Sequence, residues 1–229
     1  LLIRAFAALV PEGLGWISIY WPFAVVSLLM VGLIVAFRFT PVERKEDELV
    51  GALQTHVELL KRPLVLLYFL GIFMYVGSEQ GVANWISEFL STYHGFDPQT
   101  TGAQTVSWFW GMMTAGTVLG LVVLKLFDSR RILVVFTAMA MASLTLALFS
   151  PGNVALYAFP AVGFFISIMY PVIISLALNS VEEHHGSFAG ILMTGIAGGA
   201  IVPLIVGALG DLFGLRQGMF FLYLTFGYI

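Results

Sequence analysis

The chain has 229 residues, of which 59% are hydrophobic and only 10% are charged, and its formal net charge is -3. Ordinary soluble domains carry about 45–50% apolar and roughly 25% charged residues, and a soluble chain of this size could not bury so much apolar surface. The composition therefore excludes a soluble enzyme, a disordered tail and a nucleic-acid-binding protein, and it indicates a multi-span membrane protein. Because the chain contains no cysteine, disulfides and thiolate metal sites are excluded as well.

Long apolar runs predict the membrane-spanning helices, and the run 64–92 is apolar apart from Glu79 and Glu88. A helix needs about 20 residues to cross a hydrocarbon core of about 30 Å. The runs that approach this length lie at about 16–38, 64–92, 101–125, 131–150, 153–181, 186–210 and 217–229. The final run stops after 13 residues, and the chain opens on Leu1 rather than Met. We therefore expect a fragment of a longer protein, with an incomplete last span.

The charges of the connections predict the orientation. One set of alternate connections carries Arg38, Arg44, Lys45, Lys61, Arg62, Lys125, Arg130 and Arg131, whereas the opposite side carries only Arg4 and Arg216. By the positive-inside rule, the segment 39–62 is cytoplasmic. Within it, Leu49, Leu53, Val57 and Leu60 recur at helical spacing. This pattern favours an amphipathic helix at the inner membrane surface, and a solvated linker is the alternative.

Glu79 is the most informative residue, because it lies near the middle of the run 64–92. A carboxylate at this depth costs at least about 2.5–3.5 kcal/mol on insertion scales, and is by default a hypothesis of function. No predicted span has a Lys or Arg in its interior, so Glu79 must be protonated, face water or pair outside this chain. Removal from water disfavours the charged form of a carboxyl group. Glu79 is therefore predicted to load and release a proton.

Two further polar residues, Gln80 and Asn84, follow Glu79 at short spacing. They would line one cavity with Glu79 if the turn between Gly77 and Gly81 is loosened, as in the broken helices of transporters. Close helix packing is the alternative interpretation of the two glycines, since they have small-xxx-small spacing.

Trp108 shares a helical stripe with Gln104 and Ser107. An indole ring beside amide and hydroxyl groups suits a sugar, although an aromatic belt at the membrane interface is an equal alternative. Tyr170 precedes Pro171, which is predicted to free the carbonyl group of Ser167 and to kink its helix. Such a kink either borders a substrate path or marks a merely bent helix.

A short acidic and histidine-containing loop, Glu182-Glu183-His184-His185, is the one candidate metal cluster. It lacks the H-E-x-x-H pattern and is better explained as a solvated loop, so we expect no metal and no other cofactor. No histidine lies inside a predicted span, and the chain has no cysteine. An intramembrane enzyme, which needs a nucleophile–base pair or a metal, is therefore disfavoured.

Several motifs resemble those of the fucose/glucose-galactose proton symporter family, which is part of the major facilitator superfamily. The motifs are Tyr75-Val76-Gly77-Ser78-Glu79, similar to Y-V-G-x-E, then Met169-Tyr170-Pro171 with Ser175-Leu176-Ala177-Leu178, and Gly186-Ser187 with Gly198-Gly199-Ala200-Ile201-Val202-Pro203. The likeness covers most of residues 64–215. The superfamily's inner-loop motif, G-x-x-x-D-R-x-G-R-K, persists only as Gly120, Lys125, Arg130 and Arg131.

The resemblance implies an all-α integral membrane fold. Residues 1–38 would end the N-terminal bundle, residues 39–62 would form the cytoplasmic linker between bundles, and residues 63–229 would form a six-helix C-terminal bundle with a truncated last helix. The missing N-terminal bundle would complete the protein in a plasma membrane or bacterial inner membrane.

The resemblance also implies a non-enzymatic function, secondary active transport of a monosaccharide with protons by alternating access. The substrate-binding residues would be Glu79, Gln80, Asn84, Trp108 and Tyr170, with Glu79 also in proton coupling. Lys125, Arg130 and Arg131 would be candidates for a cytoplasmic gate. The alternatives are a drug or metabolite carrier of the same superfamily and a membrane scaffold that transports nothing.

Overall fold

The computed structural model describes residue 17 and residues 20–37 and 53–229, and every regular element among these residues is a helix. The chain divides into two compact units, residues 1–44 and 45–229, which are described separately. In the first unit, helix α2 (Tyr20–Ala36) has 17 residues, none of which is buried. It lies within the predicted span 16–38. Arg4, Arg38, Arg44, Lys45 and Leu49 lie outside the described residues.

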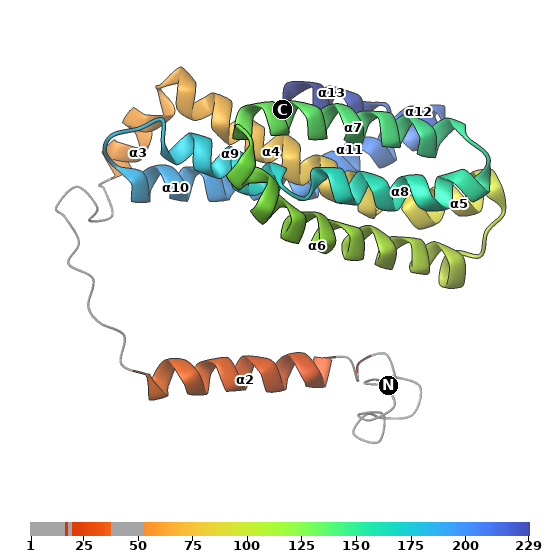
Figure 1. Ribbon diagram of the computed structural model, residues 1–229, viewed down its shortest axis with the longest axis horizontal. Coiled ribbons are helices and arrows are strands. Elements are labelled where there is room, and N and C mark those ends of the chain that lie inside the picture. The colour runs from red at the N-terminus through yellow and green to blue at the C-terminus, as the bar shows by residue number, and fades with distance from the viewer. Residues whose placement is uncertain (1–16, 18–19, 38–52) are drawn as a thin grey trace. The chain divides into compact units, whose positions relative to one another are not determined.

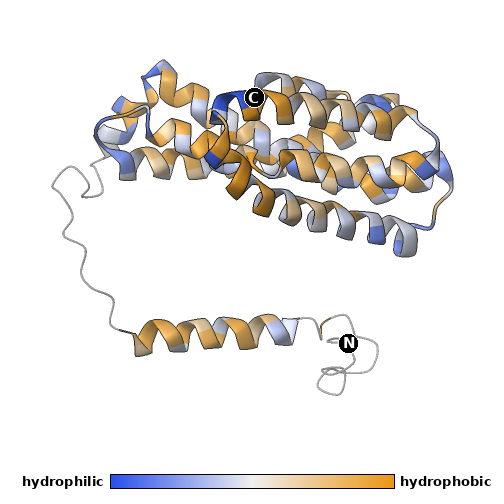
Figure 2. Ribbon diagram, viewed as in Figure 1, coloured by the Kyte–Doolittle hydropathy of each residue, from blue (hydrophilic) through white to orange (hydrophobic). Residues whose placement is uncertain are grey.

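The second unit is a bundle of helices joined by short connections (Figure 1). Its helices are α3 (Leu53–Leu60), α4 (Pro63–Ala83), α5 (Ile86–His94), the π-helix η4 (Pro98–Gly102), α6 (Ala103–Leu126), α7 (Ser129–Phe149), α8 (Gly152–Ile166), α9 (Met169–Leu178), α10 (His185–Thr194), the 3-10 helix η5 (Gly195–Ala197), α11 (Gly198–Phe213), α12 (Leu215–Gly218) and α13 (Phe221–Tyr228). Figure 2 shows that these helices are mostly hydrophobic.

Five helical stretches of the described residues are long and apolar enough to cross a membrane. They are Pro63–Ala83, Pro98–Leu126, Ser129–Phe149, Gly152–Leu178 and His185–Phe213. The expected all-α membrane fold is therefore confirmed. The last predicted run, 217–229, is occupied by part of α12 and by α13.

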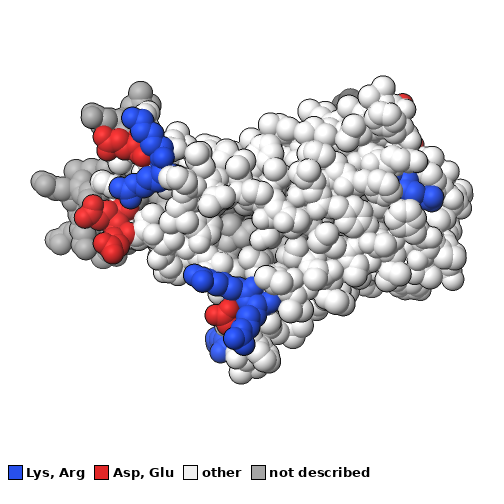
Figure 3. All heavy atoms as spheres, turned by 90° about the horizontal axis from the view of Figure 1, so that it is seen from above, with Lys and Arg blue, Asp and Glu red and all other residues white. Residues whose placement is uncertain are grey.

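Apart from Glu79, most charged residues of the described chain lie in or near the connections between helices. Lys125, Arg130 and Arg131 flank the α6–α7 turn, and all three are exposed. Asp128 caps α7 by accepting hydrogen bonds from the backbone N–H groups of Arg130 and Arg131, each at 3.1 Å. Figure 3 shows the charged side chains of one face gathered mainly toward one end, with a broad uncharged band beside them. This distribution suits a bundle that spans a hydrocarbon layer.

The predicted helix 64–92 is divided in two, because α4 ends at Ala83 and α5 begins at Ile86. The indole N–H of Trp85 donates a 3.1 Å hydrogen bond to the carbonyl oxygen of Pro203 in α11. The break thus lies at Asn84 and Trp85. The turn between Gly77 and Gly81 stays helical, so the loosened turn considered from the sequence is not found there.

Gly77 and Gly81 instead allow α4 to pack closely on its neighbours. A Cβ atom at Gly77 would lie 2.9 Å from Cβ of Val202, and one at Gly81 would lie 2.7 Å from Cδ2 of Leu222. These distances are too short for real side chains. The packing interpretation of the glycine pair therefore agrees with the structure, and it joins α4 to α11 and α13.

The break between α8 and α9 lies where Pro171 predicts it. Proline cannot donate to the carbonyl group four residues earlier, which belongs to Ser167. In the structure α8 ends at Ile166 and α9 begins at Met169. The Ser167 carbonyl oxygen accepts a long hydrogen bond of 3.5 Å from the hydroxyl group of Thr117 in α6, so the freed acceptor has a partner.

Helix α3 lies at the start of the bundle and contacts α4 and α10. Its buried side chain is Leu59, only 1% exposed, whereas Val57 and Leu60 of the predicted apolar stripe are exposed. The side that packs on the bundle therefore differs from the predicted stripe. The exposed apolar residues remain available to a membrane surface.

Candidate functional site

Glu79 lies in α4, four residues before its last residue, and its side chain is half-buried. Its Oε2 atom accepts a 2.6 Å hydrogen bond from the hydroxyl group of Tyr75. Its Oε1 atom lies 3.2 Å from Nε2 of Gln80, which donates to it. No Lys or Arg among the described residues forms an ion pair with it. The carboxyl group is therefore held by two uncharged donors.

Tyr75 links Glu79 to α9. Tyr75 is only 3% exposed, and its ring centroid lies 5.8 Å from that of Tyr170, with a tilt of 46° between the planes. The Tyr170 hydroxyl group in turn points to Sδ of Met193 in α10, at 3.5 Å. The structure thus brings together three of the predicted residues, Glu79, Gln80 and Tyr170, with Tyr75, which the sequence analysis names within a motif but not as a site residue. The i, i+4 spacing of Tyr75 and Glu79 is the signal that could have identified it.

Asn84 does not join this group. It is exposed in the break between α4 and α5, and it lines a separate cavity of about 590 Å³ toward one end of the bundle. That cavity is also lined by Glu88 and Asp211, and the Glu88 carboxylate accepts a 3.2 Å hydrogen bond from Thr92. Asn84 and Glu79 therefore lie in different surroundings although they are only five residues apart.

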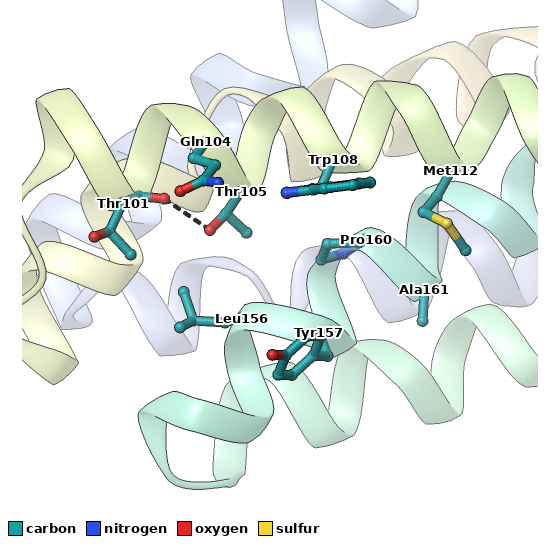
Figure 4. Close-up of a pocket in the computed structure, with 9 residues that line it drawn as sticks. All are labelled: Thr101, Gln104, Thr105, Trp108, Met112, Leu156, Tyr157, Pro160 and Ala161. Carbon is teal, nitrogen blue, oxygen red and sulfur yellow. Dashed lines mark hydrogen bonds between the residues drawn. The ribbon is translucent and has the colours of Figure 1, made fainter.

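Trp108 lies in a third place, a groove of about 530 Å³ between α6 and α8 (Figure 4). It is 59% exposed, and Gln104 lines the groove beside it. None of the lining residues comes from α4 or α9. The sequence correctly associates Trp108 with Gln104, but the structure does not bring either of them to Glu79.

The candidate gate residues, Lys125, Arg130 and Arg131, remain together at the exposed α6–α7 turn. No ion pair joins them to another part of the described chain. Their positive charge agrees with a cytoplasmic turn, as the positive-inside rule expects. A gate would need, in addition, a contact between these residues and a second bundle.

The opposite end of the bundle carries an arginine surrounded by aromatic rings. The guanidinium carbon of Arg216 lies 4.5 Å from the ring centroid of Tyr93, and the rings of Phe89 and Phe149 lie within 6 Å. The backbone N–H of Arg216 also donates a 3.0 Å hydrogen bond to the Tyr93 hydroxyl group. Burial lowers the pKa of the neighbouring His94 imidazole, and the charge of Arg216 lowers this pKa further.

The loop Glu182–His185 holds no candidate metal cluster, because no group of three metal-ligating side chains was found among the described residues. Glu182, Glu183 and His185 are exposed, and His184 has a positive φ of 61° at the start of α10. This geometry suits a tight turn before α10.

Comparisons with known proteins agree with this architecture. Residues 1–203 match the pattern of the family described as Major Facilitator Superfamily. A glucose/galactose transporter of Brucella abortus biovar 1 (strain 9-941) is 32% identical over 93% of this chain and 52% of that protein. An L-fucose-proton symporter of Escherichia coli (strain K12) is 27% identical over 61% of this chain and 32% of that protein.

A solved structure shows the same fold. The crystal structure of the transporter FucP in the outward conformation matches with a TM-score of 0.79 at 22% identity, over 93% of this chain and 53% of that chain. The chain thus spans about half the length of the relatives that it matches. The helical block agrees with a C-terminal half of that fold, and the likeness to glucose/galactose and fucose transporters expected from the motifs is confirmed. The chain belongs to the Major Facilitator Superfamily.

Proposed function

We propose that this chain is the C-terminal portion of a secondary active transporter that carries a monosaccharide together with protons. The named activities of the glucose/galactose transporter and of the L-fucose-proton symporter support the substrate class and the coupling ion. The remaining half of the carrier would come from an N-terminal bundle. Residues 1–38 would end that bundle, residues 39–62 would form a cytoplasmic linker, and residues 63–229 would form the second bundle in a plasma membrane or bacterial inner membrane.

The observation that carries the proposal is the environment of Glu79. Its carboxyl group is half-buried in an apolar helix and is held by Tyr75 and Gln80 without an ion pair among the described residues. A tyrosine hydroxyl group can donate to a carboxylate and can accept from a carboxylic acid. Tyr75 can therefore partner Glu79 in both protonation states, which is what a proton-coupling residue requires.

The candidate substrate site consists of Glu79, Gln80 and Tyr170, the three predicted residues that the structure gathers. A carboxylate accepts hydrogen bonds from sugar hydroxyl groups, an amide both accepts from them and donates to them, and an aromatic ring packs on the apolar face of a pyranose. The break between α8 and α9 lies beside this group, because α9 begins at Met169, next to Tyr170, as expected where helices border a polar path. Alternating access would expose the group to each side of the membrane in turn, with Lys125, Arg130 and Arg131 near the cytoplasmic opening.

The experiment uses the full-length protein in cells or proteoliposomes without other hexose uptake. Accumulation of labelled glucose, galactose and fucose is measured with and without an inward proton gradient, and exchange is measured without a gradient. We expect Glu79→Gln to abolish gradient-driven accumulation and to retain exchange. Glu88→Gln is the matched control, because Glu88 is exposed nine residues later, and it should retain both activities.

Three outcomes separate the alternatives. Wild-type protein that accumulates no hexose would overturn the substrate class. Efflux of a cationic dye in its place would identify a drug carrier of the same superfamily. Accumulation by the Glu79→Gln protein equal to that of the wild type would show that Glu79 is not the coupling residue.

A further inference from the structure

We propose that Gly199 of α11 is a positioning residue for the candidate site, because it holds the Gln80 side chain in the orientation that donates to Glu79. This role deepens the proposed function and rests on it in one respect, namely that Glu79 is the group that binds and releases protons. Since Gly199 has no side chain, its effect on the carboxyl group passes through Gln80.

The hydrogen bond between Gln80 and Glu79 does not follow from helix geometry alone. Side chains three or four residues apart share one face of a helix, whereas successive side chains point about 100° apart. Tyr75 has the favourable spacing and reaches Oε2 of Glu79 directly. Gln80 is the next residue after Glu79, yet its Nε2 atom lies 3.2 Å from Oε1. The Gln80 side chain must therefore bend round α4, and a neighbouring helix that blocks other directions would hold it there.

Helix α11 supplies this contact at Gly199. A Cβ atom at Gly199 would lie 3.0 Å from Cγ of Gln80 and 3.0 Å from Cγ1 of Val76, so the backbone of α11 packs directly on both side chains. One residue earlier, a Cβ atom at Gly198 would overlap the backbone of Phe73, which fixes α11 against α4. The Gln80 side chain is thus confined on the side that faces α11.

A methyl group at Gly199 would displace Gln80 rather than Val76. In a helix a valine side chain keeps one strongly preferred χ1 rotamer, whereas glutamine has more rotamer freedom. The Cγ atom of Gln80 would have to give by a few tenths of an ångström. At 3.2 Å the hydrogen bond to Glu79 is already at the long end of the range for N–H···O bonds, which is about 2.7–3.2 Å. The bond therefore has no slack to absorb this displacement.

Other titratable groups do not replace Gln80 beside the carboxyl group. Within the described chain, Glu79 bonds to Tyr75 and Gln80, and α9 brings Tyr170 to the ring of Tyr75. The titratable residue of α11 is Asp211, about 18 Å farther along that helix at about 1.5 Å per residue. The remaining titratable residues of the described helices that pack on α4 are His56 and Glu58 in α3, Tyr157 in α8, His185 in α10, and Tyr223 and Tyr228 in α13. The Gln80 amide is therefore the contact of Glu79 that the packing of α11 controls.

The test follows the protonation of Glu79 in the purified full-length protein. The infrared C=O band of protonated carboxyl groups is recorded over a series of pH values, and the part of the band that Glu79→Gln removes belongs to Glu79. We expect Gly199→Ala to shift the midpoint of this titration by about one pH unit. Gln80→Ala should shift it equally and in the same direction, because a hydrogen bond to a charged group changes a protonation equilibrium by about tenfold or more.

Gly207→Ala is the matched control on the same helix. A Cβ atom at Gly207 would lie 2.7 Å from Cζ2 of Trp85, so this variant also disturbs the packing of α11 but does not touch Gln80. It should lower the unfolding midpoint and leave the Glu79 titration unchanged. The double variant Gly199→Ala with Gln80→Ala removes the crowded Cγ atom, so it provides the comparison if Gly199→Ala alone does not fold. Its titration should equal that of Gln80→Ala.

Four results would each overturn the positioning role. They are an unchanged midpoint in Gly199→Ala, a band that Glu79→Gln leaves intact, an equal shift in Gly207→Ala, and a double variant whose midpoint differs from that of Gln80→Ala. The titration does not depend on which solute is carried. Wild-type protein that accumulates no hexose but shows the expected shifts would therefore overturn the proposed function and leave the role of Gly199 standing.

Discussion

The hydroxyl group of Tyr75 donates a 2.6 Å hydrogen bond to Oε2 of Glu79, one turn farther along α4. Because Tyr75 is only 3% exposed and its ring packs against Tyr170, the direction of this hydroxyl group is fixed by packing. Buried polar groups need such partners when they lie far from water. Tyr75 is therefore a positioning residue for Glu79, and it links the carboxyl group to α9.

The hydrogen bond between Tyr75 and Glu79 predicts the effect of removing the Tyr75 hydroxyl oxygen. In the full-length carrier, Tyr75→Phe should lower proton-driven sugar accumulation by about tenfold or more, because hydrogen bonds to charged groups contribute about 1.5–3 kcal/mol. Initial uptake rates under an inward proton gradient measure the effect. Tyr223→Phe is the control, since it removes a hydroxyl group that pairs with Thr145 at 2.8 Å, away from Glu79. Equal accumulation by the two variants would contradict the assigned role of Tyr75.

The contact of Gly77 with α11 predicts a loss of stability on adding a methyl group. Gly77→Ala would force Val202 to move, because the new Cβ atom would overlap Cγ2 of Val202 and lie 2.9 Å from its Cβ atom. Overpacking of this kind destabilises by about 1–3 kcal/mol. The thermal unfolding midpoint of the purified protein should fall, and Val202→Ala should restore part of the loss in the double variant.

Gly111→Ala is the matched control for this prediction. Gly111 lies in the middle of α6, and a Cβ atom there would meet nothing within 4 Å in the described chain. The substitution should leave the unfolding midpoint unchanged or raise it slightly, since alanine favours a helix over glycine by about 0.5–1 kcal/mol. A fall as large as that of Gly77→Ala would show that close packing is not the cause.

A buried pair of hydroxyl groups joins α4 to α13. Oγ of Ser78 and Oγ1 of Thr225 lie 2.6 Å apart, and both side chains are fully buried. Hydrogen bonds between membrane helices contribute about 0.6 kcal/mol on average and at most about 1.7 kcal/mol. A double-mutant cycle of Ser78→Ala and Thr225→Val, measured by unfolding, should give a coupling energy in this range. Additive effects of the two substitutions would rule out a stabilising pair.

The sequence predicts the helices and the break between α8 and α9, because both depend on residues that are close together in the chain. Apolar runs define the spans, and Pro171 signals the break at Ser167 through its missing N–H group. The break at Asn84 and Trp85 has no such signal. There the Trp85 indole bonds to Pro203, which is 118 residues away in the chain, so only the packing of α11 against α4 and Trp85 reveals it.

The sequence predicts only that part of the candidate site whose residues are neighbours in the chain. Glu79 and Gln80 are neighbours in sequence, and an intramembrane carboxylate stands out in any apolar run. The position of Trp108 depends on which side of α6 faces α8, and a polar stripe on one helix does not identify its neighbour. The sequence therefore identifies candidate polar and aromatic residues within the spans, but it cannot assign them to one cavity.

The last prediction concerns pH and the end of the bundle at His94. Burial and the charge of Arg216 lower the pKa of His94 below its ordinary value of 6.5. The Nε2 atom of His94 is buried without a hydrogen-bond partner in the described chain, so a proton added there would have no acceptor. Between pH 6.5 and the lower folded-state pKa, the unfolded chain binds more protons than the folded chain, and stability must fall as the pH falls. Unfolding midpoints of the purified protein measured from pH 7.5 downward should therefore decrease below about pH 6.5.

His94→Phe keeps a ring beside Phe89 and Phe96 and removes the titrating group, so it should flatten this part of the profile. An unchanged slope in that variant would assign the pH dependence to other groups.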